Sequence, residues 1–208
     1  LVCGFIVGDD QLRLEPAVER AMARDVERLQ REIPADRLTI QWDVCYEIVG
    51  TDGGPKLPYD DHVEGSVERV GRLCGLVNDG VELRIHLCYG DPGHKHIVEP
   101  KNLATCVAFT NGICRASPRQ VNFIHMPVPR DRSDDDYFRP LESLDMPAET
   151  RLILGLIHYT DGVEGGRKRI ATASRVVDDF DLATECGFGR RDPATILDLL
   201  RIHKALCT

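Results

Sequence analysis

Four side chains with the character of metal ligands stand at the ends of apolar segments. His86 and Cys88 form an H-x-C pair, and strand alternation puts both side chains on the same side. Cys186 ends the last apolar segment, and His125 ends an earlier one. Two imidazoles and two thiolates would form the tetrahedral nitrogen and sulfur site that zinc prefers. In the alternative interpretation, both thiols pack as apolar groups and backbone hydrogen bonds satisfy both histidines.

Other polar side chains near these segment ends could bind a substrate. Trp42 and Asp43 close the second apolar segment, where a carboxylate is costly to bury unless it is paired or used. Asp43 would hold a substrate amine or cation, although loop capping fits it equally. Arg130 follows a stiff Pro-Val-Pro segment and suits a carboxylate or phosphate, unless it pairs with the aspartates nearby. His94 lies in the loop after the H-x-C pair, which is either a substrate lid or an exposed polar loop.

One histidine is a candidate for proton transfer. His158 ends the fifth apolar segment, and Asp161 follows closely enough to orient the imidazole as a general acid or base. Such pairs are common, so this one only suggests catalysis. The remaining cysteines, including Cys45, have no ligand-like pairing, and we expect them in the core or in helices.

The scaffold for these residues is an alternation of strands and helices. Short β-branched segments alternate six times with longer amphipathic ones, which is typical of the α/β class. Nearly continuous apolar character predicts buried parallel strands at Val2–Val7, Leu38–Val44, Val81–Cys88, Val121–His125, Leu152–His158 and Asp181–Cys186. Helical periodicity predicts helices at Glu15–Ile33, His62–Val77, Pro100–Arg115, Asp135–Ser143, Glu164–Asp179 and Pro193–Leu206. Pro16 falls in the first turn of the first helix, and Asp192 is the expected N-cap of the last.

The number of units leaves two architectures open. One is an open doubly wound sheet, and the other is a (β/α)₈ TIM barrel of which this chain holds about six βα units. The start at Leu1, without Met, favours a single barrel domain over residues 1–208 that lacks its two N-terminal units. The open edges of such a barrel would need covering, either by further residues or by a partner chain, which makes a homo-oligomer one of the expectations. Both architectures place their sites in the loops after the strands.

Composition excludes several classes of partner. The chain has 208 residues with 26 Lys+Arg against 34 Asp+Glu, and the net charge of −8 argues against nucleic acid. No segment approaches the roughly 18 apolar residues of a membrane span, and Leu1–Val7 is too short for a signal peptide. Eight cysteines in a chain of this size, several inside apolar segments, indicate reduced thiols. We therefore expect a cytoplasmic protein.

Three short motifs carry a resemblance to a known family. Ile40-Gln41-Trp42-Asp43, His86-Leu87-Cys88-Tyr89 and Glu185-Cys186-Gly187 occur in the order and at roughly the spacing of the catalytic domain of cobalamin-independent methionine synthase. The chain resembles a divergent member of that superfamily, which also includes uroporphyrinogen decarboxylase-like barrels. The resemblance covers nearly the whole chain and corresponds to strands three to eight of the family's (β/α)₈ barrel.

The resemblance implies roles for individual residues. His86, Cys88 and Cys186 fall on three zinc ligands of the family, and Asp43 falls on a carboxylate that binds the substrate's amino group. His125 stands where the family has a glutamate ligand. The histidine that assists methyl transfer in the family follows an Asp-x-His pattern, so His158 is not at the matching position.

These observations lead to one main functional hypothesis and two rivals. The main hypothesis is a zinc-dependent transferase that moves a methyl or related alkyl group from a small-molecule donor to a thiol. In the first rival, a hydrolase or lyase, zinc activates water and His158 shuttles the proton. In the second, the barrel binds a small molecule without catalysis.

Overall fold

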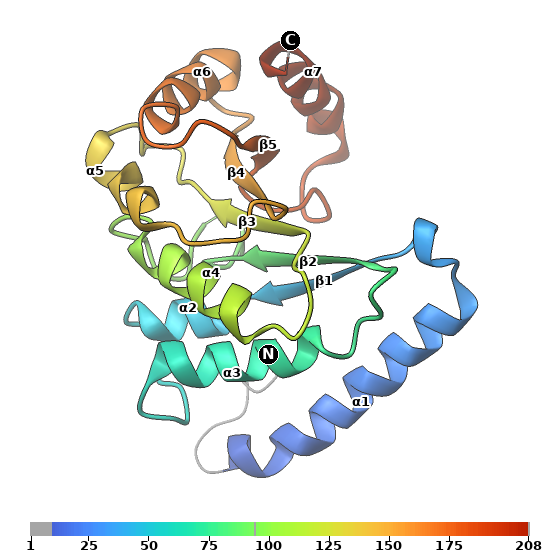
Figure 1. Ribbon diagram of the computed structural model, residues 1–208. Coiled ribbons are helices and arrows are strands. Elements are labelled where there is room, and N and C mark those ends of the chain that lie inside the picture. Colours follow the sequence, from blue (N-terminus) through green and yellow to red (C-terminus); the bar gives the residue numbers. More distant parts are fainter. Residues whose placement is uncertain (1–9, 94, 208) are drawn as a thin grey trace.

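Residues 10–93 and 95–207 are described by the computed structural model of the chain, shown as a ribbon in Figure 1. The expected strand Val2–Val7 and the candidate substrate residue His94 lie outside the described residues. Within the described ranges, strands and helices alternate along the chain as predicted. This confirms the α/β class.

One parallel sheet positions the candidate site. Its strands are β1 (Thr39–Val44), β2 (Glu82–Leu87), β3 (Phe123–Pro127), β4 (Arg151–Ile157) and β5 (Asp181–Thr184). Their spatial order equals their order in the chain, so each strand lies beside the one before it. A doubly wound sheet reverses direction partway across, and the five described strands contain no reversal. This order is consistent with part of a TIM-barrel-like fold, and β1 and β5 are the edges of the described sheet.

Helices follow the strands in the same progression. They are α1 (Asp10–Glu32), α2 (Tyr46–Thr51), α3 (His62–Cys74), α4 (Ala104–Ala116), α5 (Asp135–Phe138), α6 (Gly162–Ala173) and α7 (Ile196–Leu206). Short 3₁₀ turns are η2 (Ala35–Arg37), η3 (Arg139–Ser143) and η4 (Pro193–Thr195). Figure 1 shows α3, α4, α5 and α6 in chain order beside the strands. None of the helices in the described ranges is both long and apolar enough for a bilayer crossing.

The two faces of the sheet differ in polarity. Leu83, Ile85 and Leu87 of β2 are buried in the core with apolar residues of α3 and α4, and β3 and β4 repeat this alternation. The intervening positions of β2, Arg84 and His86, face the other side. A slip of one residue would bury the polar set, so this alternation fixes the register. The candidate ligand His86 therefore lies on the face away from this core.

The helix boundaries differ from the prediction in informative places. Helix α2 occupies the first part of the segment after β1, where the helical periodicity of the sequence predicts no helix. Helix α1 begins at Asp10, so Pro16 lies inside it instead of in its first turn. The turn before Pro16 is held from outside, because Glu15 accepts hydrogen bonds from Arg69 and Arg72 of α3. Asp192 caps as expected, accepting from the Ala194 N–H at the start of η4.

Candidate metal centre

Three of the four predicted ligands converge at one end of the sheet. The ligand atoms of His86, Cys88 and Cys186 all lie within 4.8 Å of one another, and His86 Nε2 is 3.8 Å from Cys186 Sγ. Alternation at the end of β2 puts His86 and Cys88 on the same face, and the Gly90 N–H donates to Cys88 Sγ at 3.2 Å. Small shifts would bring the three atoms to the distances of about 2.0–2.3 Å that zinc needs. One nitrogen and two sulfurs are donors that suit zinc.

Cys186 reaches this cluster because the chain crosses the sheet after β5. Across a flat sheet, β2 and β5 would be about 14 Å apart at the usual strand spacing. The chain spans this gap by passing over Gly155 of β4, where a Cβ atom would lie 2.7 Å from Glu185 Cα and 3.3 Å from His125 Nε2. The Thr184 hydroxyl donates to the Cys186 carbonyl at 2.6 Å and holds the turn. A side chain at Gly155 would therefore press on the backbone of the residue directly before Cys186.

His125 contacts the cluster through another histidine. Its Nδ1 lies 2.8 Å from His86 Nδ1, and the two rings stack with centroids 4.7 Å apart. Burial and the neighbouring His86 lower the pKa of His125 to about 3, so it is neutral near pH 7. One of the two Nδ1 atoms donates to the other, which leaves His86 Nε2 to face the thiols. The three-residue cluster found among the described residues therefore does not include His125.

The sequence analysis missed a third thiol beside the cluster. Cys45 directly follows β1 and shares a side-chain hydrogen bond with Cys88. That bond lowers the pKa of Cys45. The hydrogen bond from Cys186 lowers the pKa of Cys88, but the bond with Cys45 and burial outweigh it and raise the value to about 12. The sequence predicts Cys45 in the core or in a helix; only the pairing of β1 with β2 brings it to this position.

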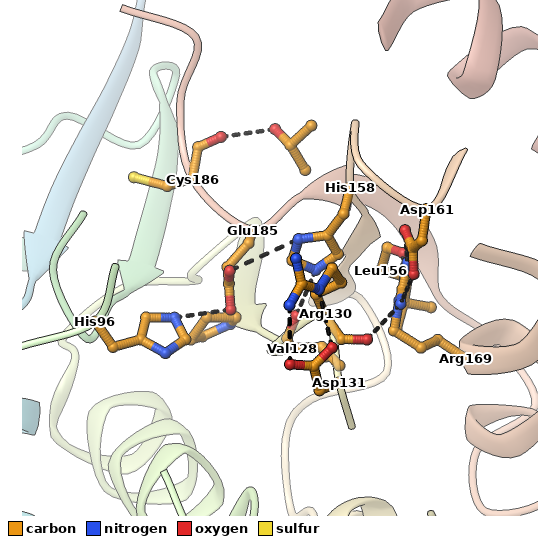
Figure 2. A network of polar contacts seen from close by, with 12 residues as sticks. His96, Val128, Arg130, Asp131, Leu156, His158, Asp161, Arg169, Glu185 and Cys186 are labelled. Atoms are coloured by element: carbon orange, nitrogen blue, oxygen red, sulfur yellow. Dashed lines mark hydrogen bonds and ion pairs between the residues drawn. The ribbon is translucent and has the colours of Figure 1, made fainter. Parts of the chain in front are cut away.

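Glu185 lies between two histidines next to this cluster, as Figure 2 shows. Its carboxylate oxygens lie 2.8 Å from His96 Nε2 and 3.9 Å from His158 Nδ1. His158 Nε2 donates to the Val128 carbonyl at 2.8 Å, so Nδ1 carries the lone pair of the neutral ring. Burial opposes the charge of His96, but Glu185 and Glu99 outweigh burial and raise its pKa to about 9. Its raised pKa makes His96 cationic near pH 7. Burial lowers the pKa of His158, so His158 is neutral at that pH.

Asp161 does not orient His158 as expected. Both of its oxygens accept hydrogen bonds from Arg169, at 2.6 and 3.0 Å. Arg169 is almost completely buried and also donates to the carbonyls of Leu156 and Arg130. A buried guanidinium is costly without a carboxylate partner, and Asp161 is the partner of Arg169. Figure 2 shows Asp161 directed towards Arg169 and not towards the ring of His158.

A cavity of about 600 Å³ opens beside Cys186, within the usual range for small-molecule sites. His96, His158 and Glu185 line it, together with Arg130, which pairs with Asp131 at 2.9 and 3.0 Å. Arg191 also lines this cavity, and its buried Nε has no acceptor among the described residues. The cavity combines groups that could hold an anion with a neutral histidine.

Trp42 and Asp43 lie on opposite faces of β1. Asp43 pairs in register with His86, is exposed on the polar face, and accepts a hydrogen bond from Gln41 Nε2 at 2.8 Å. Trp42 pairs with Ile85 and packs against the hydrophobic core. Of these two candidate substrate residues, only Asp43 faces the side of the metal-ligand cluster.

Fold and site together place the chain among α/β proteins with a possible metal site. The described chain is a sequentially wound parallel α/β structure with a His/Cys/Cys group at the carboxyl ends of its strands. No family model and no curated protein matches it. Among solved structures, it is similar to a candidate vitamin-B12-independent methionine synthase from Listeria monocytogenes, with a TM-score of 0.60, 13% identity and 95% of this chain covered. It is also similar to a B12-independent methionine synthase from Shewanella sp. W3-18-1 in complex with selenomethionine, with a TM-score of 0.59, 17% identity and 95% coverage.

These likenesses concern the fold. At 13% and 17% identity, they show that the α/β scaffold is related to that of B12-independent methionine synthase structures. The chain covers 56% of the Listeria structure and 55% of the Shewanella structure, so it spans just over half the length of each.

Proposed function

We propose that the chain binds one zinc ion through His86, Cys88 and Cys186 and transfers a methyl or related alkyl group to a small-molecule thiol. The observation that carries this proposal is the convergence of the three ligand atoms within 4.8 Å, from strands that are not neighbours in the sheet. The likeness in fold to methionine synthase structures supports the type of reaction. We also propose that the five-stranded arc is part of a (β/α)₈ barrel.

The donor set suits activation of a thiol. A free thiol has a pKa near ~8.5 and is mostly protonated at neutral pH. Zinc, when bound, would lower the pKa of a substrate thiol and so supply a thiolate nucleophile. His86 would present Nε2 to the metal and donate its Nδ1–H to His125, which is neutral and can accept it. His125 thereby acts as a positioning residue for His86.

The polar residues beside the cluster would manage charge and protons. His158 is neutral and holds its lone pair at Nδ1, so it can accept the proton that a substrate thiol loses. Cationic His96 ties the loop after β2 to Glu185 next to Cys186. This ion pair fixes one wall of the cavity in which a substrate would lie.

The cavity fits an amino-acid-sized thiol. Arg130 and Arg191 line it and could bind a carboxylate. Asp43, which pairs in register with His86 but lines a neighbouring cavity, could bind an amine that extends towards it. The Shewanella methionine synthase is in complex with selenomethionine, the selenium counterpart of a methyl thioether. A methyl thioether is the product that methyl transfer to such a thiol would give.

The test combines metal content with product analysis. The full chain, loaded with zinc, is incubated with homocysteine and methyl iodide as a model methyl donor, and the methyl thioether is quantified by mass spectrometry. We expect zinc-dependent methylation that Cys186→Ser abolishes and Cys114→Ser, in helix α4, leaves unchanged. Zinc binding that accelerates p-nitrophenyl acetate hydrolysis but not thiol methylation would favour the water-activating alternative. Absence of bound zinc would contradict both the transferase and the water-activating alternative.

A further inference from the structure

We propose that Cys45 is a third thiolate ligand of this metal centre, which makes the donor set one imidazole nitrogen and three sulfurs. The inference rests on the proposed metal site and extends it. It concerns a residue that the family resemblance does not assign to the metal.

Strand pairing brings Cys45 to Cys88. Val44 and Leu87 are the last paired residues of β1 and β2, so Cys45 and Cys88 occupy the next position on each strand. The Cys88 N–H donates to the Val44 carbonyl at 3.1 Å, which continues the ladder to this position. Alternation from Asp43, whose partner in register is His86, puts the Cys45 side chain on the polar face with the other ligands.

The thiols form a continuous chain of contacts. Cys45 is hydrogen-bonded to Cys88, Cys88 to Cys186, and Cys186 to His86. Sulfur atoms that share a tetrahedral zinc ion are about 3.8 Å apart, which follows from bond lengths of about 2.3 Å. Cys45 lies outside the three-residue group whose ligand atoms are all within 4.8 Å of one another, so its side chain must move towards that group to share one ion. Its contact with Cys88 places it on the side from which that movement is short.

Simple packing does not explain the position of Cys45. The buried thiols of Cys74 and Cys106 belong to the hydrophobic core, whereas Cys45 is only partly buried. Cys45 stands at the N-cap of α2, where the side-chain oxygen of a serine or aspartate would usually accept a backbone N–H hydrogen bond, but its side chain makes no capping hydrogen bond. The thiol contacts Cys88 instead.

His125, the ligand expected from the sequence, is less suited to the fourth position. Its Nδ1 is engaged with His86 Nδ1, so binding a metal through that atom would break the contact that orients His86. Three thiolates and Zn²⁺ give the centre one net negative charge, compared with zero for two thiolates. A more electron-rich centre favours a nucleophilic sulfur. Exchange of Cys45 for a substrate thiolate would leave that charge unchanged, so this ligand is compatible with the proposed function.

Counting bound sulfurs tests the inference. The full chain is loaded with Co²⁺, and the sulfur-to-cobalt charge-transfer absorption is compared between wild type, Cys45→Ser and the control Cys114→Ser. We expect Cys45→Ser to lose about one third of the intensity and the control to lose none. Because Cys45→Ser could misfold, X-ray absorption of zinc-loaded wild type gives an independent count, expected to be three sulfurs and one nitrogen.

The possible failures are distinguishable. Two sulfurs in the wild-type spectrum, or full charge-transfer intensity in folded Cys45→Ser, would overturn the role of Cys45 and leave the three-residue site intact. If no metal binds to the wild-type chain, the proposed function fails together with this inference.

Discussion

Substitution of Gly155 by alanine tests how the proposed metal centre is assembled. The new Cβ would lie 2.7 Å from Glu185 Cα and 3.2 Å from Glu185 N, against ordinary contacts of 3.4 Å or more, so the crossing segment must move by about 3.4 − 2.7 = 0.7 Å. Both contacts are backbone atoms and cannot rotate away. Because Cys186 is the next residue, its sulfur would move by a similar distance, which exceeds the tolerance of about 0.2 Å for metal–ligand distances.

The expected result is a weakened but folded protein. Overpacking of this kind costs about 1–3 kcal/mol of unfolding free energy, and loss of ligand geometry weakens zinc binding about 10–100-fold. Urea unfolding of the metal-free protein measures the first, and competition with a chromophoric chelator measures the second. Gly189→Ala is the control, because a Cβ there meets nothing within 4 Å. Zinc affinity in Gly155→Ala equal to that of the wild type would refute this account of how Cys186 is placed.

Three further predictions follow from the surrounding network. The pKa of His96 is raised from 6.5 to about 9, so its stabilising contribution is present below pH 6.5 and lost as the pH rises through 9. In urea unfolding, the free-energy cost of His96→Gln should fall from about 3 kcal/mol at pH 6 to almost nothing at pH 10. A cost that does not change with pH would count against the ion pair with Glu185. His125→Phe removes the partner of His86 Nδ1 and should weaken zinc binding about 10–100-fold. Because the pKa of His125 is lowered to about 3, it contributes stability above pH 6.5 that is lost towards pH 3, so acid unfolding curves of the variant should be shallower; parallel curves would contradict this. Arg169→Met removes the cation that pairs with Asp161, whose side chain is 29% exposed. The substitution should lower the free energy of unfolding by about 3 kcal/mol in thermal or urea unfolding. An unchanged midpoint would show that the pair does not stabilise the fold.

Local patterns were enough to predict much of the scaffold. The period-two alternation around His86 and Cys88 is a property of any strand, so their common face followed directly from the sequence. The sequential strand order did not follow, because both candidate architectures use the same βα units. The strand order depends on contacts between distant segments, and the order of the described strands is consistent with part of a barrel.

The composition of the site depended on contacts that no local pattern records. Cys186 lies 3.8 Å from His86, one residue after the backbone that packs over Gly155, and this path depends on the pairing of the whole sheet. The engagement of His125 with His86, and of Cys45 with Cys88, follows from register between neighbouring strands. Sequence proximity was misleading for Asp161, because a buried arginine eight residues further along binds it more strongly than His158 can.

The central claim is that His86, Cys88 and Cys186 share one metal ion. A crystal of the zinc-loaded full chain, measured on both sides of the zinc absorption edge, tests it most directly. The account predicts one anomalous peak at about 2.0–2.3 Å from His86 Nε2 and from the two sulfur atoms. A zinc-loaded crystal with no peak between these three residues, or with the zinc bound elsewhere, would contradict it.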